Sequence, residues 1–269
     1  VITYDPPSGG PRGLVTHRIT AIGQRDGRRV YRTRGDANAA ADPWVLYDWA
    51  PSPFCVKVRA LLDHKRLPYR RQGVLGPALW QLYRRGRVGK VPALQIGERL
   101  ITDSTDIALE LERLHPHPAV LPADAGLRAR CLALEDWCDE WLYFIGLHQQ
   151  WIDPEGAPMV PLAFGRGPLG RVAYALYRRR IAAQLRGQGL GRKTPERIAE
   201  DLRRAVDTID ALLQPGPFLL GAQPLLCDFA LFGQLVYWTR PPKTARAIAG
   251  RPAIQAFLAR MKALRGAAG

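Results

Sequence analysis

The chain has 269 residues, 47% of them hydrophobic and 23% charged, which excludes a wholly disordered or collagen-like protein. At about 150 residues per domain, this length predicts roughly two domains. The formal net charge of +15 favours anionic partners. The sequence contains no uninterrupted apolar run of about 20 residues, so no transmembrane span is predicted. Four scattered cysteines without paired CxxC spacing predict reduced thiols and a cytoplasmic location.

Residues 1–43 differ in texture from the rest, with seven Arg, four Asp and little helical periodicity. Segments Leu14–Ile19 and Arg29–Thr33 predict two short strands around a turn at residues 25–27. Because an isolated two-stranded hairpin is only marginally stable, we do not expect this segment to fold well alone.

From Trp44 the pattern predicts a βαβαββα unit of about 70 residues. Ser52 and Pro53 open its first helix as N-cap and first helical residue. The expected elements are a strand at 45–47, a helix at 53–66, a strand from 69, a helix at 77–85, a hairpin of strands 92–96 and 99–101, and a helix at 104–114.

Beyond Leu121 the pattern is almost entirely helical. Thr194 before Pro195 is a clear helix-start signal. The expected helices are 127–151, 171–186, 195–213, 228–237 and 252–264. The sequence therefore predicts an α/β domain at 44–115 and an all-helical domain at 121–269.

Three short segments of the βαβαββα unit carry potential chemistry. At Ser52-Pro53-Phe54-Cys55, a hydroxyl or thiol beside free N–H groups at a helix start favours an anionic sulfur. Lys90-Val91-Pro92 precedes a strand and is a candidate cis-proline turn that presents backbone groups to a peptide-like ligand. At Asp103-Ser104, a helix start is suited to a ligand carboxylate, with Asp103 available to an amine.

Each segment alone is more often an ordinary cap or strand edge, but their order and spacing are informative. Residues 44–269 resemble the glutathione S-transferase family, with a thioredoxin-like N-terminal domain and an all-helical C-terminal domain. The matching stretches are 52–59, 90–94, 103–107, Pro217-Phe218-Leu219-Leu220-Gly221 and Cys227-Asp228-Phe229. The last two are similar to the helical domain's folding motif, although the Ser or Thr cap usual before Asp228 is replaced by Pro224-Leu225-Leu226.

The resemblance implies a role for each matching position. Ser52 would donate a hydrogen bond to the sulfur of glutathione, the co-substrate. Val91 and Pro92 would hold its cysteinyl part, and Asp103 and Ser104 its γ-glutamyl end. Phe54 and Lys90 would line the site, and a homodimer is expected.

Cys55 stands where a thioredoxin-type CxxC has its second cysteine, with Ser52 in the first place. A dithiol cycle needs the first thiol, so this chemistry is disfavoured. A small buried hydrophobe is the favoured interpretation of Cys55, and a mixed disulfide with glutathione is the alternative.

Residues 1–43 resemble a different family, the C-terminal tail of the catalytic domain of serine–histidine type I signal peptidases. The matching residues are His17 as general base, and Asp36 or Asp42 as its acidic partner. The nucleophilic serine and the membrane helix of that family would lie upstream and are not matched in these residues. This segment is therefore expected to be a fusion remnant or the end of a neighbouring reading frame, and an intact peptidase fused in a longer parent chain is the alternative.

Other signals favour structural interpretations. The basic stretch 178–204 is interleaved with acids and lacks a nucleic-acid motif, so we expect a solvated helix face. The pair His115 and His117 lies in a linker and predicts no metal site. Trp137, Trp141 and Trp151 are expected in the core more often than in a substrate pocket.

We therefore expect a serine-type glutathione transferase that conjugates glutathione to an electrophilic, largely apolar small molecule. No nucleic-acid partner, membrane or metal is expected. The alternatives are a non-catalytic interaction module of the same fold and a glutathione-dependent reductase or dehalogenase.

Overall fold

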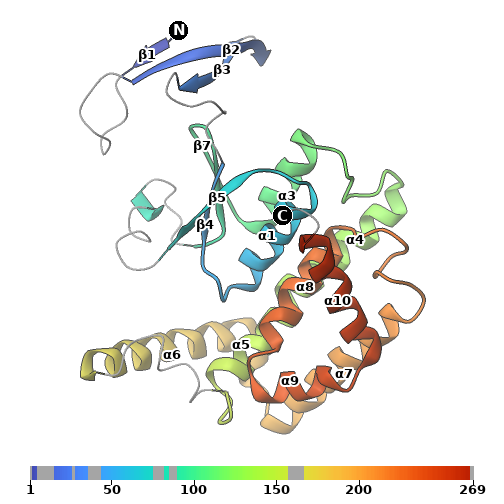
Figure 1. The fold of residues 1–269 in the computed structure, drawn as a ribbon. Helices are drawn as coiled ribbons and strands as arrows, with labels where there is room; N and C mark the ends of the chain where they lie inside the picture. The colour runs from blue at the N-terminus through green and yellow to red at the C-terminus, as the bar shows by residue number, and fades with distance from the viewer. Residues whose placement is uncertain are drawn as a thin grey trace.

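The computed structural model describes most of the chain (Figure 1). The described residues are 2–4, 15–25, 28–35, 44–74, 82–84, 90–156 and 167–266. Within them, none of the helices combines the length and the apolar character that crossing a bilayer requires.

The first sheet lies at the N-terminus and contains β1 (Ile2–Tyr4), β2 (Val15–Arg25) and β3 (Arg28–Gly35) in that order. Both pairings are antiparallel, and the register shifts between Ile19 and Ala21. The hairpin predicted from the sequence is confirmed. It is longer than expected, and β1 extends it to three strands.

The second sheet is formed by β4 (Trp44–Asp48), β5 (Tyr69–Gly73), β6 (Ala93–Ile96) and β7 (Arg99–Thr102). The strand order is β5-β4-β6-β7, with β5 parallel to β4 and the other pairings antiparallel. This is the thioredoxin-like arrangement expected from the sequence.

Two helices complete this unit. α1 (Pro53–His64) crosses from β4 to the parallel β5, and α3 (Ser104–Leu114) follows β7. The helix expected at 77–85 lies mostly outside the described residues, of which 82–84 are helical.

The remaining described residues are almost all helical. α4 (Ala125–Trp137), the π-helical segment η1 (Cys138–Leu142) and α5 (Tyr143–Trp151) continue one another where a single helix was expected. The others are α6 (Pro168–Gln188), the short η4 (Leu190–Arg192), α7 (Pro195–Leu213), α8 (Leu226–Trp238), α9 (Pro242–Ala249) and α10 (Pro252–Gly266). The bounds of α7 match the expectation because Thr194 caps it, and α9 was not predicted.

One hydrophobic core serves both domains. It joins Leu61 of α1 and Ile107 of α3 to Phe229 and Trp238 of α8, all fully buried. Gly233 permits this close packing, since a Cβ added there would lie 2.4 Å from the carbonyl oxygen of Pro53. The first turn of α1 is therefore pressed directly against the helical domain (Figure 1).

The start of α8 is organised by the carboxylate of Asp228. Its two oxygens accept the backbone N–H groups of Leu219 and Leu225, at 2.8 and 2.9 Å. The N-cap position is Leu225, so the hydroxyl cap is absent as the sequence indicated. Burial raises the pKa of Asp228 to about 6.

Candidate functional site

The three segments singled out in the sequence meet at one end of the four-stranded sheet. Tyr47 in β4 pairs with Ala93 in β6, and Ala93 pairs in turn with Thr102 in β7. β4 runs past Tyr47 towards Ser52, and β7 runs past Thr102 into Asp103, whereas β6 begins just after Pro92. The antiparallel register therefore brings all three turns to the same end of the sheet, although they are widely separated in the chain.

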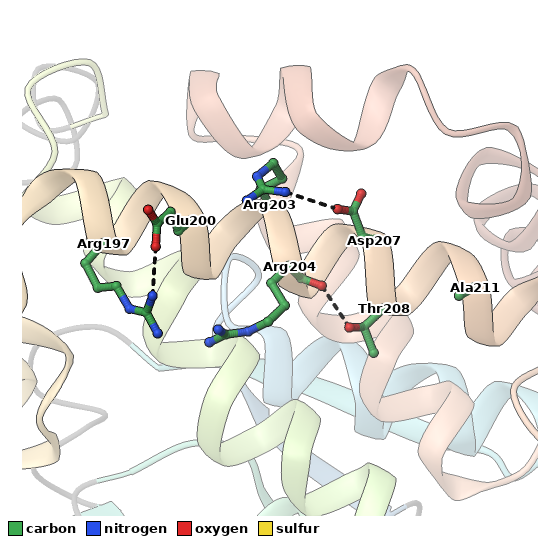
Figure 2. A pocket seen from close by; sticks show the side chains of 7 residues that line it. All are labelled: Arg197, Glu200, Arg203, Arg204, Asp207, Thr208 and Ala211. Atoms are coloured by element: carbon green, nitrogen blue, oxygen red, sulfur yellow. Dashed lines mark hydrogen bonds and ion pairs between the residues drawn. The ribbon is translucent and has the colours of Figure 1, made fainter.

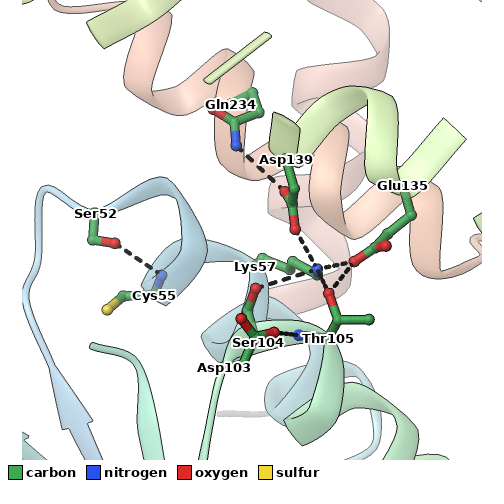
Figure 3. A network of polar contacts seen from close by, with 9 residues as sticks. All are labelled: Ser52, Cys55, Lys57, Asp103, Ser104, Thr105, Glu135, Asp139 and Gln234. Carbon is green, nitrogen blue, oxygen red and sulfur yellow. Dashed lines mark hydrogen bonds and ion pairs between the residues drawn. The ribbon is translucent and has the colours of Figure 1, made fainter. Parts of the chain in front are cut away.

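Ser52 is the N-cap of α1 and is 6% exposed. Its Oγ accepts the backbone N–H of Cys55 at 3.3 Å (Figure 3). Pro53 occupies the first helical turn. This bond uses the oxygen as an acceptor and leaves the hydroxyl hydrogen to be donated. A ligand sulfur at this helix start would meet a hydroxyl donor and the positive end of the helix.

The turn before Ser52 is held from both domains. Arg59 of α1 forms a salt bridge with the buried Asp48 and donates a hydrogen bond to the carbonyl oxygen of Ala50 at 3.2 Å. From the end of α8, Arg240 donates to the carbonyl oxygen of Pro51 at 3.1 Å. Two guanidinium groups thus orient consecutive peptide units of this turn.

Cys55 lies on the first turn of α1 and is fully buried. Its Sγ accepts the backbone N–H of Trp49 at 3.4 Å. Burial raises the pKa of the Cys55 thiol to about 11, so this thiol is protonated at neutral pH. A buried, protonated thiol has the character of a packing group rather than of a nucleophile.

The second turn contains the cis peptide bond between Val91 and Pro92. Pro92 is buried, Val91 is half-buried and Lys90 is exposed. Since Ala93 opens β6 opposite Tyr47, Val91 lies just beyond the last paired residue of the strand. Its position at this end of the sheet suits it to a peptide-like ligand.

The third turn has a strained backbone at Asp103, with φ 82° and ψ 134°. A residue with a side chain rarely adopts this conformation, which costs about 1–3 kcal/mol and is most often kept at functional sites. The Asp103 carboxylate accepts the backbone N–H of Thr105 at 2.9 Å and is exposed. Ser104 behind it is buried, and its Oγ accepts a hydrogen bond from Lys57 Nζ at 3.4 Å.

Sequence reasoning missed the polar cluster beneath this third turn. Lys57, Glu135 and Asp139 come from α1, α4 and η1 and meet in the interior (Figure 3). The available signal was a lysine between two valines in an apolar helix, a place where a solvated charge is not expected.

Aromatic residues connect the site to the helical domain. The ring of the half-buried Phe54 packs against Tyr143 of α5, with 4.8 Å between centroids. Burial raises the pKa of Tyr143 to about 12. Trp151 is buried with its ring centroid 4.8 Å from that of Tyr177, and the ammonium group of Lys193 lies over the ring of Trp141.

Several basic side chains of the stretch 178–204 are paired with acids. On α7, Arg197 bonds Glu200 at 2.8 Å and Arg204 bonds the buried Asp201 at 2.6 Å. A hollow of about 500 Å³ on this helix is lined by α7 residues alone, far along the chain from the three turns (Figure 2). Among the described residues, no group of three or more His, Cys, Asp or Glu side chains is placed to hold a metal ion.

Comparison with known protein families identifies both domains. Residues 46–119 match the family model described as glutathione S-transferase, N-terminal domain. Residues 192–260 match the model described as glutathione S-transferase, C-terminal domain. The two models together cover slightly more than half of the chain.

A curated relative matches part of the chain. It is the isoprene-epoxide–glutathione S-transferase of Rhodococcus sp. (strain AD45), 31% identical over 120 residues. The match covers 43% of this chain and 50% of that protein, so the chain spans about half the length of this relative.

Solved structures share the fold. A β-etherase from Sphingobium sp. strain SYK-6 superposes with a TM-score of 0.61 at 19% identity, covering 84% of this chain and 98% of that one. A glutathione transferase homologue from Sulfitobacter with bound glutathione gives a TM-score of 0.58 at 16% identity, covering 84% and 96%. At these identities the likeness establishes the fold.

Proposed function

Because the chain belongs to the glutathione S-transferase family, we propose that it is a serine-type transferase that conjugates glutathione to an apolar electrophile. The observation that carries the proposal is the pairing of Tyr47, Ala93 and Thr102, which brings the three turns to one end of the sheet. A tripeptide can span this end of the sheet with each of its parts against a different turn.

In this proposal Ser52 acts on the thiol of glutathione. Its hydroxyl donates a hydrogen bond to the sulfur and stabilises the thiolate, which is the nucleophile. The start of α1 adds the positive end of a helix dipole. The thiol proton is released to solvent, and the thiolate forms a carbon–sulfur bond to the electrophile. The leaving group or opened ring takes the displaced electron pair, and an opened ring is then protonated by solvent.

The other two turns orient the tripeptide. The backbone of Val91 beside Pro92 pairs with the cysteinyl part, while Asp103 and Ser104 hold the ammonium and carboxylate of the γ-glutamyl end. Phe54 and Lys90 line the site. Holding both reactants in one place supplies a large part of the rate.

The electrophile is proposed to lie against the helical domain beside Phe54 and Tyr143, whose rings are in contact. An apolar epoxide is the class we favour, since the matching relative is named for an isoprene epoxide. We propose a cytoplasmic homodimer with domains at 44–115 and 121–269.

For residues 1–43 we propose the origin indicated by their resemblance, a remnant of a signal peptidase tail. His17 lies in β2, paired with Ile2 and Gly35. Asp36 and Asp42 lie outside the described residues. A general base without its nucleophile performs no acyl transfer, so residues 1–43 by themselves supply no peptidase activity.

Calorimetric titration with glutathione, combined with ultraviolet absorbance of the bound thiolate, tests the proposal. We expect wild type to bind glutathione and lower its thiol pKa, and Ser52→Ala to bind it without the thiolate signal. Cys55→Ala is the matched control and should behave as wild type, because the Cys55 thiol is buried and protonated.

Two results would contradict the assignment. A thiolate signal that persists in Ser52→Ala removes the role of Ser52. A folded wild-type protein that does not bind glutathione favours the non-catalytic interaction module instead.

A further inference from the structure

Lys57 is a cation in the interior of the protein, with 1% of its surface exposed. Its Nζ forms a salt bridge with Glu135 and contacts Asp139 Oδ2 at 2.7 Å (Figure 3). Burial acts to lower the pKa of Lys57, but the two carboxylates outweigh it and raise the pKa, so the ammonium group is charged at neutral pH.

The same ammonium group contacts the first turn of α3. Its three N–H donors are shared among four acceptors, because beside the two carboxylates it lies 3.2 Å from Thr105 Oγ1 and 3.4 Å from Ser104 Oγ. Thr105 in turn donates to Glu135 Oε1 at 2.6 Å. The cluster therefore joins α1, α3 and the helical domain at one point.

The hydrogen bond from Lys57 restricts the orientation of the Ser104 hydroxyl group. With its oxygen accepting from an ammonium group, the hydroxyl is oriented and its hydrogen is directed to another acceptor. Hydrogen bonds in such chains polarise one another, which makes this hydroxyl a stronger donor. A ligand carboxylate at the third turn would receive that hydrogen.

We propose that Lys57 is a positioning residue for glutathione, which acts through Ser104 and Thr105 on the γ-glutamyl end. This proposal rests on the proposed function, since it assigns a positioning residue to the same glutathione site. Lys57 is too deeply buried to touch the ligand, and its effect passes through the first turn of α3.

The experiment must avoid an unpaired buried charge, because removing one partner of a buried ion pair is strongly destabilising. The variant Lys57→Met/Glu135→Gln/Asp139→Asn removes all three charges together. We expect it to fold and to bind glutathione about tenfold more weakly, which corresponds to one hydrogen bond to a charged group. The KM for glutathione should rise more than kcat falls.

A double-mutant cycle separates positioning from a merely structural role. Ser104→Ala should weaken glutathione binding more in wild type than in the triple variant, because only in wild type does Lys57 orient and strengthen the Ser104 hydroxyl as a donor. Equal effects of Ser104→Ala in both backgrounds, or unaltered affinity in the triple variant, would overturn the proposal.

Lys65→Met/Glu112→Gln is the matched control, because it likewise removes both charges of a buried ion pair. Lys65 is also a buried lysine at α1, and it donates to Glu112 Oε2 and to the carbonyl oxygens of His115 and Pro118 at 2.7–2.8 Å. It does not contact the third turn, so its loss should lower stability and leave glutathione affinity unchanged.

A measurement on wild type tests the same proposal if the triple variant does not fold. With ¹⁵N-labelled lysine, the Lys57 ammonium resonance should shift when glutathione saturates the protein, and the Lys65 resonance should not. Binding without a shift at Lys57 would overturn the proposal, whereas no binding by wild type overturns the proposed function itself.

Discussion

Arg240, at the end of α8, donates a hydrogen bond to the carbonyl oxygen of Pro51, 189 residues earlier in the chain. The bond ties the helical domain to the turn that carries Ser52. Together with the salt bridge between Arg59 and Asp48, it holds this turn from both domains.

Replacement of Arg240 by Met should loosen the Ser52 turn without unfolding the protein. Loss of one such hydrogen bond amounts to about 1 kcal/mol, so kcat/KM for glutathione should fall by about fivefold. Amide hydrogen exchange at Ser52 should become faster, because its N–H is held within this turn by Trp49. Arg246→Met, which removes a surface pair with Glu155, is the control and should change neither measurement.

At Asp103, substitution by glycine should be less destabilising than substitution by alanine, the reverse of the usual order in chemical denaturation. Its positive φ is tolerated by glycine but strained for any other residue, at a cost of about 1–3 kcal/mol. Both Asp103→Gly and Asp103→Ala lose the cap on Thr105, but only glycine relieves the strain. We therefore expect Asp103→Gly to be about 1 kcal/mol more stable than Asp103→Ala, and both to bind glutathione weakly. An alanine variant at least as stable as the glycine variant would show that this backbone is not strained.

Asp228→Ala should be the most destabilising of the single changes considered. It leaves the backbone N–H groups of Leu219 and Leu225 without their acceptor in the interior, at about 1–3 kcal/mol each. We expect a loss of about 2–5 kcal/mol in the free energy of unfolding, measured by chemical denaturation. Asp207→Ala, which breaks the exposed pair with Arg203 and the bond with Arg251, should cost about 1 kcal/mol. Equal losses would contradict the organising role of Asp228.

The buried cluster should also make stability depend on pH. Burial raises the pKa of Asp139 to about 6, against the opposing effect of Lys57, whereas an unfolded aspartate titrates near 4. Between about pH 4 and pH 6 the folded state therefore binds more protons than the unfolded state, and the contribution of Asp139 to stability falls as the pH rises through this window.

Comparison of wild type with Asp139→Asn tests this sign. Wild type should gain stability relative to the variant as the pH falls from about 7 to about 4. Parallel unfolding free energies across this range would show that Asp139 titrates at its ordinary pKa.

Local signals in the sequence were sufficient for most of the fold. Ser52, Asp103 and Thr194 sit at helix starts where caps and prolines indicated them, and α3 and α7 have the expected bounds. These elements are predictable because a cap and an apolar periodicity act within a few residues. β1 and α9 were missed because a three-residue strand and an eight-residue helix are shorter than the stretch of about 11–18 residues over which apolar periodicity is recognised.

The amino-acid sequence by itself determined the order of the elements and the chemistry of each turn at the candidate site. Only the tertiary structure decided that Tyr47, Ala93 and Thr102 stand side by side, that Arg240 reaches Pro51, and that Lys57 meets Glu135 and Asp139. These contacts join residues 9 to 189 positions apart, and most of them lie far beyond the reach of local conformational preference. These residues come into contact only in the folded chain, where α1 packs against α8 in a core shared by both domains.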